Sequence, residues 1–108
     1  MVEMKPILFS RMRKLNGRYA FIELRFRYFI HNLTHQEILL YLFLVLASDH
    51  QGLSSYDPDT ICACLKIGLK QYQKARQSLI RKDLIAFEDP LFQVLSLPSF
   101  SPWEAADD

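Results

Sequence analysis

The 108-residue chain has few of the residue types on which many enzymes and disulfide scaffolds depend. Its three glycines stand far apart, at positions 17, 52 and 68, so the sequence has no glycine-rich phosphate-binding loop. Its two cysteines, Cys62 and Cys64, are too few for a disulfide framework, and we expect both to be free thiols.

No apolar run reaches the length of a membrane span. The longest covers residues 38–47, which is ten residues, whereas a transmembrane helix needs about 20. The N-terminus has no charged region followed by an apolar one, the pattern of a signal peptide. We therefore expect a cytoplasmic protein with no membrane partner.

The sequence does not suggest a metal or catalytic site. His31 and His35 are four residues apart, but Thr34 between them caps a predicted helix, so the two do not share a regular face. No spacing of the histidines and cysteines fits a zinc site, and no nucleophile–base pair is suggested. We expect no enzyme activity, no metal and no cofactor.

Acidic and basic residues are segregated along the chain, although the net charge is only +1. Residues 1–30 carry a net charge of +5 and residues 66–82 a net charge of +6. Residues 31–65 carry −4, and residues 83–108 carry −6. Two basic blocks can give a nearly neutral protein a local positive face, as in nucleic-acid binders.

Residues 1–30 are predicted to form a basic N-terminal arm or a β-hairpin. Asn16 and Gly17 are the favoured pair for a tight hairpin turn, which would join two strands within residues 7–24. The alternative is a loose basic arm followed by one strand over residues 19–24. A helical turn is expected at residues 26–30.

The clearest predicted helix covers residues 34–48. Thr34 and Glu37 have the spacing of a capping box, in which the hydroxyl accepts one N–H group and the carboxylate reaches back to the cap. The run that follows is apolar all round, which is typical of a helix covered on most sides. Part of that cover is expected from the N-terminal segment or from a second subunit.

Signals for two further helices follow. Asp57 is a predicted N-cap and Pro58 suits the first helical position. Gly68 is the predicted cap of the last helix. The expected elements are a strand at residues 53–54, helices at 58–65 and 69–82, strands at 84–87 and 92–95, and an acidic, disordered tail at 98–108.

This order of elements and a set of residues around the last helix resemble a winged helix-turn-helix domain. The set matches the pattern L-x-I-x-x-x-x-Y-x-x-A-R-x-x-L-x-x-x-G-L-I and consists of Leu65, Ile67, Tyr72, Ala75, Arg76, Leu79, Leu84 and Ile85. Similar modules occur in replication proteins of plasmids and phages, in DnaD-like proteins and in MarR-like regulators. The resemblance implies a mainly α fold with a small β wing (α+β) over residues 31–97.

Three positions depart from that pattern. Gly68 stands where a Ser or Thr cap is usual, and Asp83 replaces the glycine before the final strands. Asp tolerates a left-handed backbone better than most residues. The wing turn carries Glu88 and Asp89 instead of basic residues, so the helix and the N-terminal arm would have to supply most contacts with DNA.

The resemblance implies that the helix at residues 69–82 reads duplex DNA. The positions facing away from its apolar side are Lys70, Gln71, Gln73, Lys74, Gln77 and Arg81. Lys can contact guanine, Gln can pair with adenine, and Lys and Arg also reach phosphates. The alternative is an ordinary solvated face, but these positions include no acid. Arg76 is expected to pack its stem on the core and to pair its head with an acid.

The second basic block consists of Arg11, Arg13, Lys14 and Arg18. As an arm, these residues would contact the phosphate backbone or the minor groove of DNA. As the edge of a hairpin, they would be solvated charges that discourage aggregation. Both interpretations stay open.

Two functions follow as expectations. The first is a protein that binds double-stranded DNA, either a transcription regulator or an accessory to replication of a plasmid, phage or mobile element. The alternative is a protein–protein interaction module that does not bind DNA. We also expect a homodimer, because residues 34–48 and the N-terminal third carry a surplus of apolar side chains.

Overall fold

The structure, a computed structural model, describes residues 7–8, 11 and 20–98. These residues form an α+β protein with one three-stranded antiparallel sheet, which confirms the predicted fold class at this level. In chain order the elements are α1 (Phe26–Phe29), the short 3-10 helix η2 (Ile30–Asn32), α2 (His35–Ala47), β1 (Leu53–Ser55), α3 (Pro58–Leu65), α4 (Leu69–Arg81), β2 (Ile85–Glu88) and β3 (Leu91–Val94).

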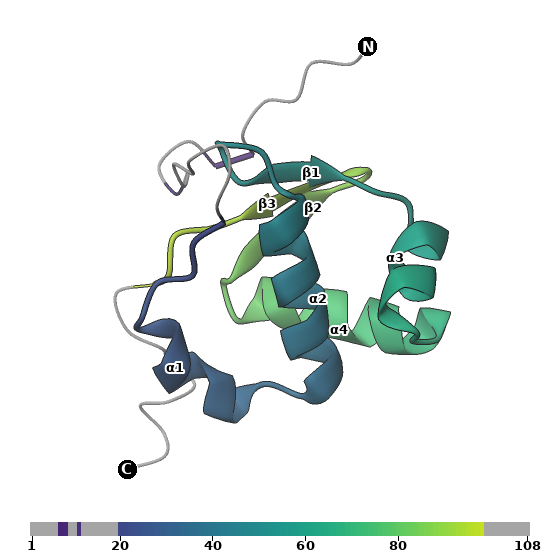
Figure 1. Cartoon of the computed structure of the whole chain (residues 1–108), viewed down its shortest axis with the longest axis horizontal. Coiled ribbons are helices and arrows are strands. Elements are labelled where there is room, and N and C mark those ends of the chain that lie inside the picture. Colours follow the sequence, from purple (N-terminus) through teal and green to yellow (C-terminus); the bar gives the residue numbers. More distant parts are fainter. Residues whose placement is uncertain (1–6, 9–10, 12–19, 99–108) are drawn as a thin grey trace.

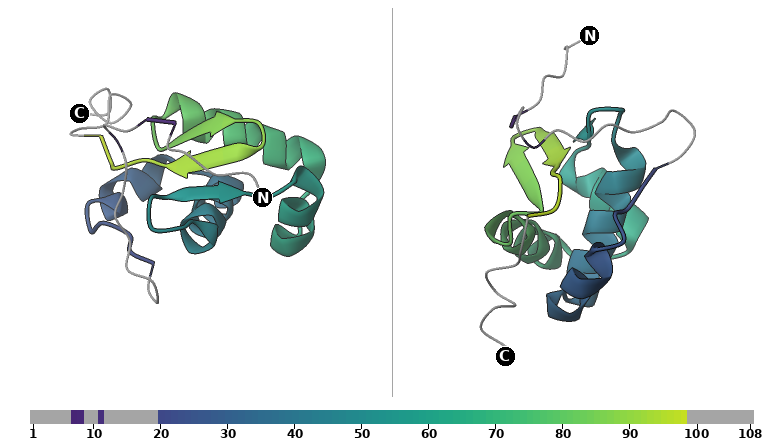
Figure 2. Two further views of the ribbon diagram at one scale, coloured as in Figure 1. Left: turned by 90° about the horizontal axis from the view of Figure 1, so that it is seen from above. Right: turned by 90° about the vertical axis from the view of Figure 1, so that its left-hand side faces the viewer.

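Helix α2 runs through the middle of the molecule, with α1 on one side and α3 on the other (Figure 1). The sheet lies near the C-terminal end of α2, and α4 crosses the N-terminal half of α2, as the turned views in Figure 2 also show. Helices α2, α3 and α4 pack on one another, and α2 and α4 also contact the sheet. This arrangement is compatible with that of a winged helix.

Helix α2 forms where its capping signal predicts it. The Thr34 hydroxyl accepts a hydrogen bond from the Glu37 N–H at 3.2 Å, and Ser48 follows the last turn. The ring of Tyr41 stacks on that of Phe26 in α1, with centroids 4.5 Å apart, so the predicted helical turn before α2 covers one of its flanks. No helix of the described residues is both long and apolar enough to cross a membrane.

The turn from α3 to α4 also follows its local signals. Asp57 accepts a backbone N–H from the first turn of α3, and Pro58 begins that helix. Lys66 ends α3 with a φ of 58°, the left-handed conformation common after a helix. Gly68 precedes α4, and its N–H donates to the side-chain oxygen of Gln71 at 2.9 Å. The predicted turn and both helix starts are therefore confirmed.

Strand β3 is the centre of the sheet, which has the order β1-β3-β2. Phe87 of β2 lies opposite Phe92 of β3, and Ile85 lies opposite Val94. Residues directly opposite each other share a face, and this face packs into the core. Asp83, which leads into β2, has a φ of 62° and thus takes the conformation expected of a residue that replaces glycine.

The core lies between α2, α4 and the inner face of the sheet. Its most completely buried members include Leu40, Leu44, Ile61, Tyr72, Leu79, Leu84, Phe92 and Val94. Burying one such side chain contributes about 1.5–3 kcal/mol to folding. These residues therefore hold α4 in a fixed position against α2.

The outer face of the sheet contacts Leu8. Gln93 alternates with Phe92 and Val94 along β3 and is fully buried although it is polar. Its amide oxygen accepts the backbone N–H of Leu8 at 2.6 Å, and its amide nitrogen donates to the Leu8 carbonyl at 2.8 Å. The buried amide is satisfied by these bonds, which anchor residue 8 on the sheet.

The N-terminal third was predicted to form either a hairpin within residues 7–24 or a single strand over residues 19–24. Both predictions are wrong for the residues that the structure describes. Residues 7–8 and 20–24 belong to no strand. Leu24 is 82% exposed, and the chain turns into α1 through a bond from the Phe26 N–H to the Glu23 carbonyl. Side chains that favour strands are not sufficient when no neighbouring strand pairs with them. The predicted turn at residues 16–17 and the tail from residue 99 lie outside the described residues.

Candidate nucleic-acid interface

Helix α4 has one buried side and one polar side. Tyr72, Ala75 and Leu79 are at most 3% exposed and face the core. All six predicted contact residues of this helix are exposed, and we call them the α4 face: Lys70, Gln71, Gln73, Lys74, Gln77 and Arg81. The sequence of α4 contains no acid. The structure therefore brings these six residues together on one solvent-facing surface.

The three glutamines of the α4 face are not equivalent. The side-chain oxygen of Gln71 caps the helix by accepting the Gly68 N–H. A bidentate contact with adenine needs both the oxygen and the nitrogen of the amide, so Gln71 makes one only if it leaves the cap. Gln73 and Gln77 take part in no side-chain hydrogen bond within the described residues. Their amides are therefore free for a ligand.

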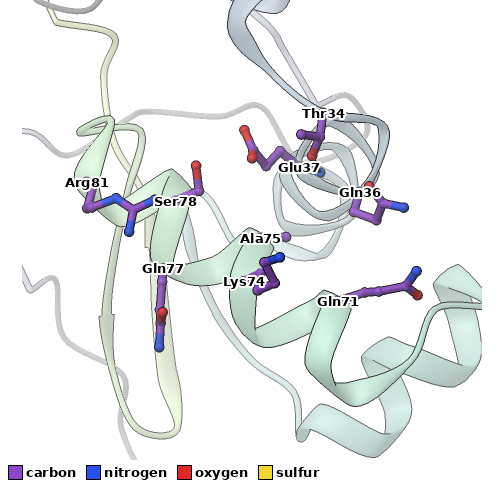
Figure 3. A pocket seen from close by; sticks show the side chains of 9 residues that line it. All are labelled: Thr34, Gln36, Glu37, Gln71, Lys74, Ala75, Gln77, Ser78 and Arg81. Atoms are coloured by element: carbon purple, nitrogen blue, oxygen red, sulfur yellow. Dashed lines mark hydrogen bonds between the residues drawn. The ribbon is translucent and has the colours of Figure 1, made fainter.

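A groove of about 420 Å³ lies between the start of α2 and α4 (Figure 3). Its lining comes from both helices and consists of Thr34, Gln36, Glu37, Gln71, Lys74, Ala75, Gln77, Ser78 and Arg81. Four members of the α4 face border it, so the face and the groove form one continuous surface. Ser78 was not among the predicted site residues, because helical spacing places it on the buried side of α4 next to Leu79.

Glu37 borders this groove and pairs with Lys82. The Lys82 Nζ lies 2.8 Å from the Glu37 Oε1 and also donates to the Asn32 carbonyl. The capping box predicted at Thr34 is therefore only half correct: the hydroxyl accepts its N–H, but the Glu37 carboxylate binds Lys82. The Glu37 side chain is only 8% exposed, and a carboxylate so little hydrated is stabilised best by a cation.

Arg11 is partly buried and is held by contacts with Asp83 and Ser96. Its Nη1 lies 2.7 Å from the Asp83 Oδ2, and its Nε donates to the Ser96 hydroxyl at 2.9 Å. The Ser96 N–H donates a hydrogen bond to the Arg11 carbonyl at 3.0 Å. A contact of Arg11 with DNA would have to replace the bond to Asp83. The other three members of the N-terminal basic block, Arg13, Lys14 and Arg18, lie outside the described residues.

Arg76 packs its guanidinium group on aromatic rings, whereas an ion pair with an acid was predicted for it. Its guanidinium carbon lies 4.6 Å from the ring centroid of Phe87 and 5.3 Å from that of Tyr72. The expected acid partner is wrong, because the described residues include no acid that pairs with Arg76. Cation–π contacts take the place of the expected ion pair. This stacking joins α4 to β2.

Exposed carboxylates lie on the elements before and after α4. Glu88 and Asp89 are exposed at the turn between β2 and β3. At the start of α3, the hydrogen bond from the Thr60 N–H lowers the pKa of Asp57 and keeps its carboxyl group ionised. The hairpin turn therefore opposes a phosphate, while α4 attracts one.

The two cysteines on α3 are free thiols, as expected. Cys64 is exposed and Cys62 is partly buried. Desolvation, with a smaller contribution from the charge of Asp59, raises the pKa of the Cys62 thiol and disfavours the thiolate. Within the described ranges, no three His, Cys, Asp or Glu side chains gather as metal ligands would.

Comparison of the chain with protein-family models, curated proteins and solved structures finds no match. The function of the α4 face therefore has to be argued from its own side chains, their exposure and their charge.

Proposed function

We propose that the protein binds double-stranded DNA through the α4 face, in the manner of a winged helix-turn-helix domain. The observation that carries the proposal is a helix face with three cations and three amides, all of them exposed, and no acid. A face made for solubility alone usually mixes charges of both signs. Lysine, arginine and glutamine supply the charge and the donors that phosphates and base edges accept.

Within this proposal the residues of α4 have different roles. Gln73 and Gln77 lie one helical turn apart and read bases. Both the oxygen and the nitrogen of each side-chain amide are without a hydrogen bond within the described residues. Lys70 and Lys74 lie one turn apart beside them and contact guanine or phosphate. Arg81, at the end of the helix, contacts the backbone.

The order of the elements supports a winged-helix assignment. Helix α3, a three-residue turn, α4 and the β2–β3 hairpin follow one another as a helix-turn-helix with a wing would. The resemblance of the sequence supports a cytoplasmic role in transcription regulation or in replication of a plasmid, phage or mobile element. The acidic hairpin turn leaves most of the base reading to α4.

A fluorescence anisotropy titration of mixed-sequence duplex DNA tests the proposal. The full-length protein is expected to bind at low salt and to weaken as salt rises, because lysines displace counterions from phosphates. Lys70→Glu together with Lys74→Glu is expected to abolish binding. Absence of binding by the unchanged protein at low salt would refute the proposal, and unchanged affinity of the double variant would place the site elsewhere.

A different observation favours a second candidate, a protein–protein interaction module. Leu39, Leu42 and Leu46 recur at helical spacing on the side of α2 opposite the core, and they are 40%, 41% and 68% exposed. We define them as the leucine stripe. A second copy of the chain is the proposed occupant, since DNA readers commonly pair their recognition helices about a two-fold axis. This candidate is compatible with DNA binding, because the stripe lies on α2 and the α4 face on α4.

A further inference from the structure

The exposed side of α4 is divided lengthwise into two strips. Successive residues of a helix are turned by about 100°, so residues four apart form rows along its surface. One edge of the exposed side is an uncharged strip that consists of Leu69, Gln73, Gln77 and Ile80. The cationic strip beside it consists of Lys70, Lys74 and Arg81. The amides and the apolar groups are therefore separated from the cations.

The apolar members of the uncharged strip contribute little to the fold. Leu69 is 51% exposed and Ile80 is 39% exposed. Within the part of the chain that the structure describes, neither packs against the buried core. Leu69 is the first residue of α4, and the first residues of a recognition helix are those that meet base edges. An exposed leucine at this place offers a surface to an apolar group of a base.

The two glutamines of the strip have both a donor and an acceptor to offer. The amides of Gln73 and Gln77 make no side-chain hydrogen bond with other described residues. In the major groove, adenine presents an acceptor at N7 and a donor at N6, which match the nitrogen and the oxygen of an amide. Thymine presents a methyl group there, whereas guanine and cytosine do not. An A·T pair is thus complementary to both kinds of side chain in the strip.

The cationic strip lies on the side of α4 that is nearer to α2. Lys74 and Arg81 border the groove between the two helices. On the opposite edge of the uncharged strip, Arg76 packs on Phe87 of the β2–β3 hairpin, whose turn is acidic and opposes a phosphate. Cations contact phosphates, so this arrangement places a DNA backbone toward α2 and the base edges against the uncharged strip.

We propose that α4 selects A·T base pairs in the major groove, with the amides of Gln73 and Gln77 on adenine and the side chain of Leu69 on the methyl group of thymine. The cationic strip contacts phosphates and adds affinity without sequence information. The inference rests on the proposed function, because it specifies which base pairs α4 reads. It goes beyond that function in naming a class of DNA sequence and a contact residue outside the α4 face.

The base preference is tested with duplexes of equal length: one of A·T pairs, one of G·C pairs, and the A·T duplex with uracil in place of thymine. Uracil lacks only the methyl group, so it separates a methyl contact from a preference for the shape of A·T-rich DNA. Affinity is measured by anisotropy at one low salt concentration. The unchanged protein is expected to bind the A·T duplex about tenfold more tightly than the G·C duplex and about fourfold more tightly than the uracil duplex.

Variants of the uncharged strip should change these ratios. Leu69→Ala shortens the apolar side chain and suits a helix, so the ratio of thymine to uracil affinity should fall to within about twofold. Leu24→Ala changes an exposed leucine before α1 and should keep the ratio of the unchanged protein. Gln73→Met with Gln77→Met removes both amides and should reduce the preference for A·T over G·C to within about threefold. Thermal melting checks each fold.

The outcomes separate this inference from the proposed function. Equal or tighter binding of the unchanged protein to the G·C duplex, or a thymine-to-uracil ratio that Leu69→Ala leaves unaltered, refutes the inference while the proposed function stands. If the unchanged protein binds no duplex at low salt, both are refuted.

Discussion

The Nζ of Lys82 lies 2.8 Å from the Oε1 of Glu37, so an ion pair joins the C-cap of α4 to the first turn of α2. The two side chains are 21% and 8% exposed, which shields the pair from water. The pair ties together the two helices that border the groove. The position of α4 therefore depends on this polar contact as well as on the core.

Breaking this pair from one side is expected to destabilise the protein. Glu37→Gln leaves the Lys82 charge poorly hydrated and should lower the free energy of unfolding by about 2 kcal/mol. Adding Lys82→Met is expected to recover at least half of the loss, because no unpaired charge is then left. Urea denaturation measures both, with the exposed Lys70→Met as a control that changes by less than about 0.5 kcal/mol. A loss that small in Glu37→Gln would contradict the structural role of the pair.

The helix starts are predictable because each has a local signal. Thr34, Asp57 and Gly68 each lie at the position where a helix begins in the structure. The polar side of α4 follows from the spacing of its apolar residues alone. The strands of the final hairpin differ from their predicted positions by one residue at each end, since strand limits depend on cross-strand pairing.

Contacts between distant residues could not be predicted from local patterns. Local spacing assigned the Glu37 carboxylate to its own helix cap, but the crossing of α2 and α4 brings Lys82 closer. Arg76 finds aromatic rings because β2 folds back beside α4. The groove exists only where two helices meet, so neither helix alone reveals its lining. The order of elements is thus readable from the sequence, whereas most of the groove is not.

Lys66→Gly is expected to stabilise the protein. Lys66 has a φ of 58°, a conformation that costs a residue with a Cβ atom about 1–2 kcal/mol. Glycine removes this cost. It also raises the conformational entropy of the unfolded chain, which lowers the free energy of unfolding by about 0.4–1 kcal/mol. A net gain of about 0.5–1 kcal/mol is expected in urea denaturation. Lys66→Ala removes the same charge and keeps the strain, so an equal gain in that control would contradict the explanation.

The cap of α3 is expected to depend on pH. The hydrogen bond from Thr60 lowers the pKa of Asp57 in the folded protein below the ordinary value of 3.8. The carboxylate therefore stabilises the fold above that value, and the stabilisation is lost as pH falls through the lower folded pKa. Asp57→Ala should lower the melting temperature at pH 7, and the difference from the unchanged protein should shrink in acid. Asp57→Asn keeps a hydrogen-bond acceptor, so its melting temperature at pH 7 should fall less than that of Asp57→Ala. If the melting temperature of Asp57→Ala differs from that of the unchanged protein by the same amount at every pH, this account is contradicted.

The leucine stripe is expected to hold two copies together. Leu42→Lys with Leu46→Lys places charge on the stripe and should convert a dimer into a monomer in sedimentation experiments. The melting temperature of the monomer's fold should change little, because Leu46 is 68% exposed and Leu42 is 41% exposed, and neither belongs to the core. Leu24→Lys changes another exposed leucine and should leave the dimer intact. A monomeric unchanged protein at high concentration would rule out this role of the stripe.

The most direct test of DNA binding by α4 is the salt dependence of duplex affinity in matched charge variants. From about 50 to 200 mM salt, the unchanged protein is expected to lose affinity roughly tenfold to a hundredfold. Replacing Lys70 and Lys74 together by Gln should reduce the slope of log affinity against log salt by about two, since two phosphate contacts are lost. Lys66→Gln, which removes one charge just outside α4, should keep the slope of the unchanged protein. Equal slopes in all three proteins, or no binding at the lower salt concentration, would contradict the proposal that α4 binds DNA.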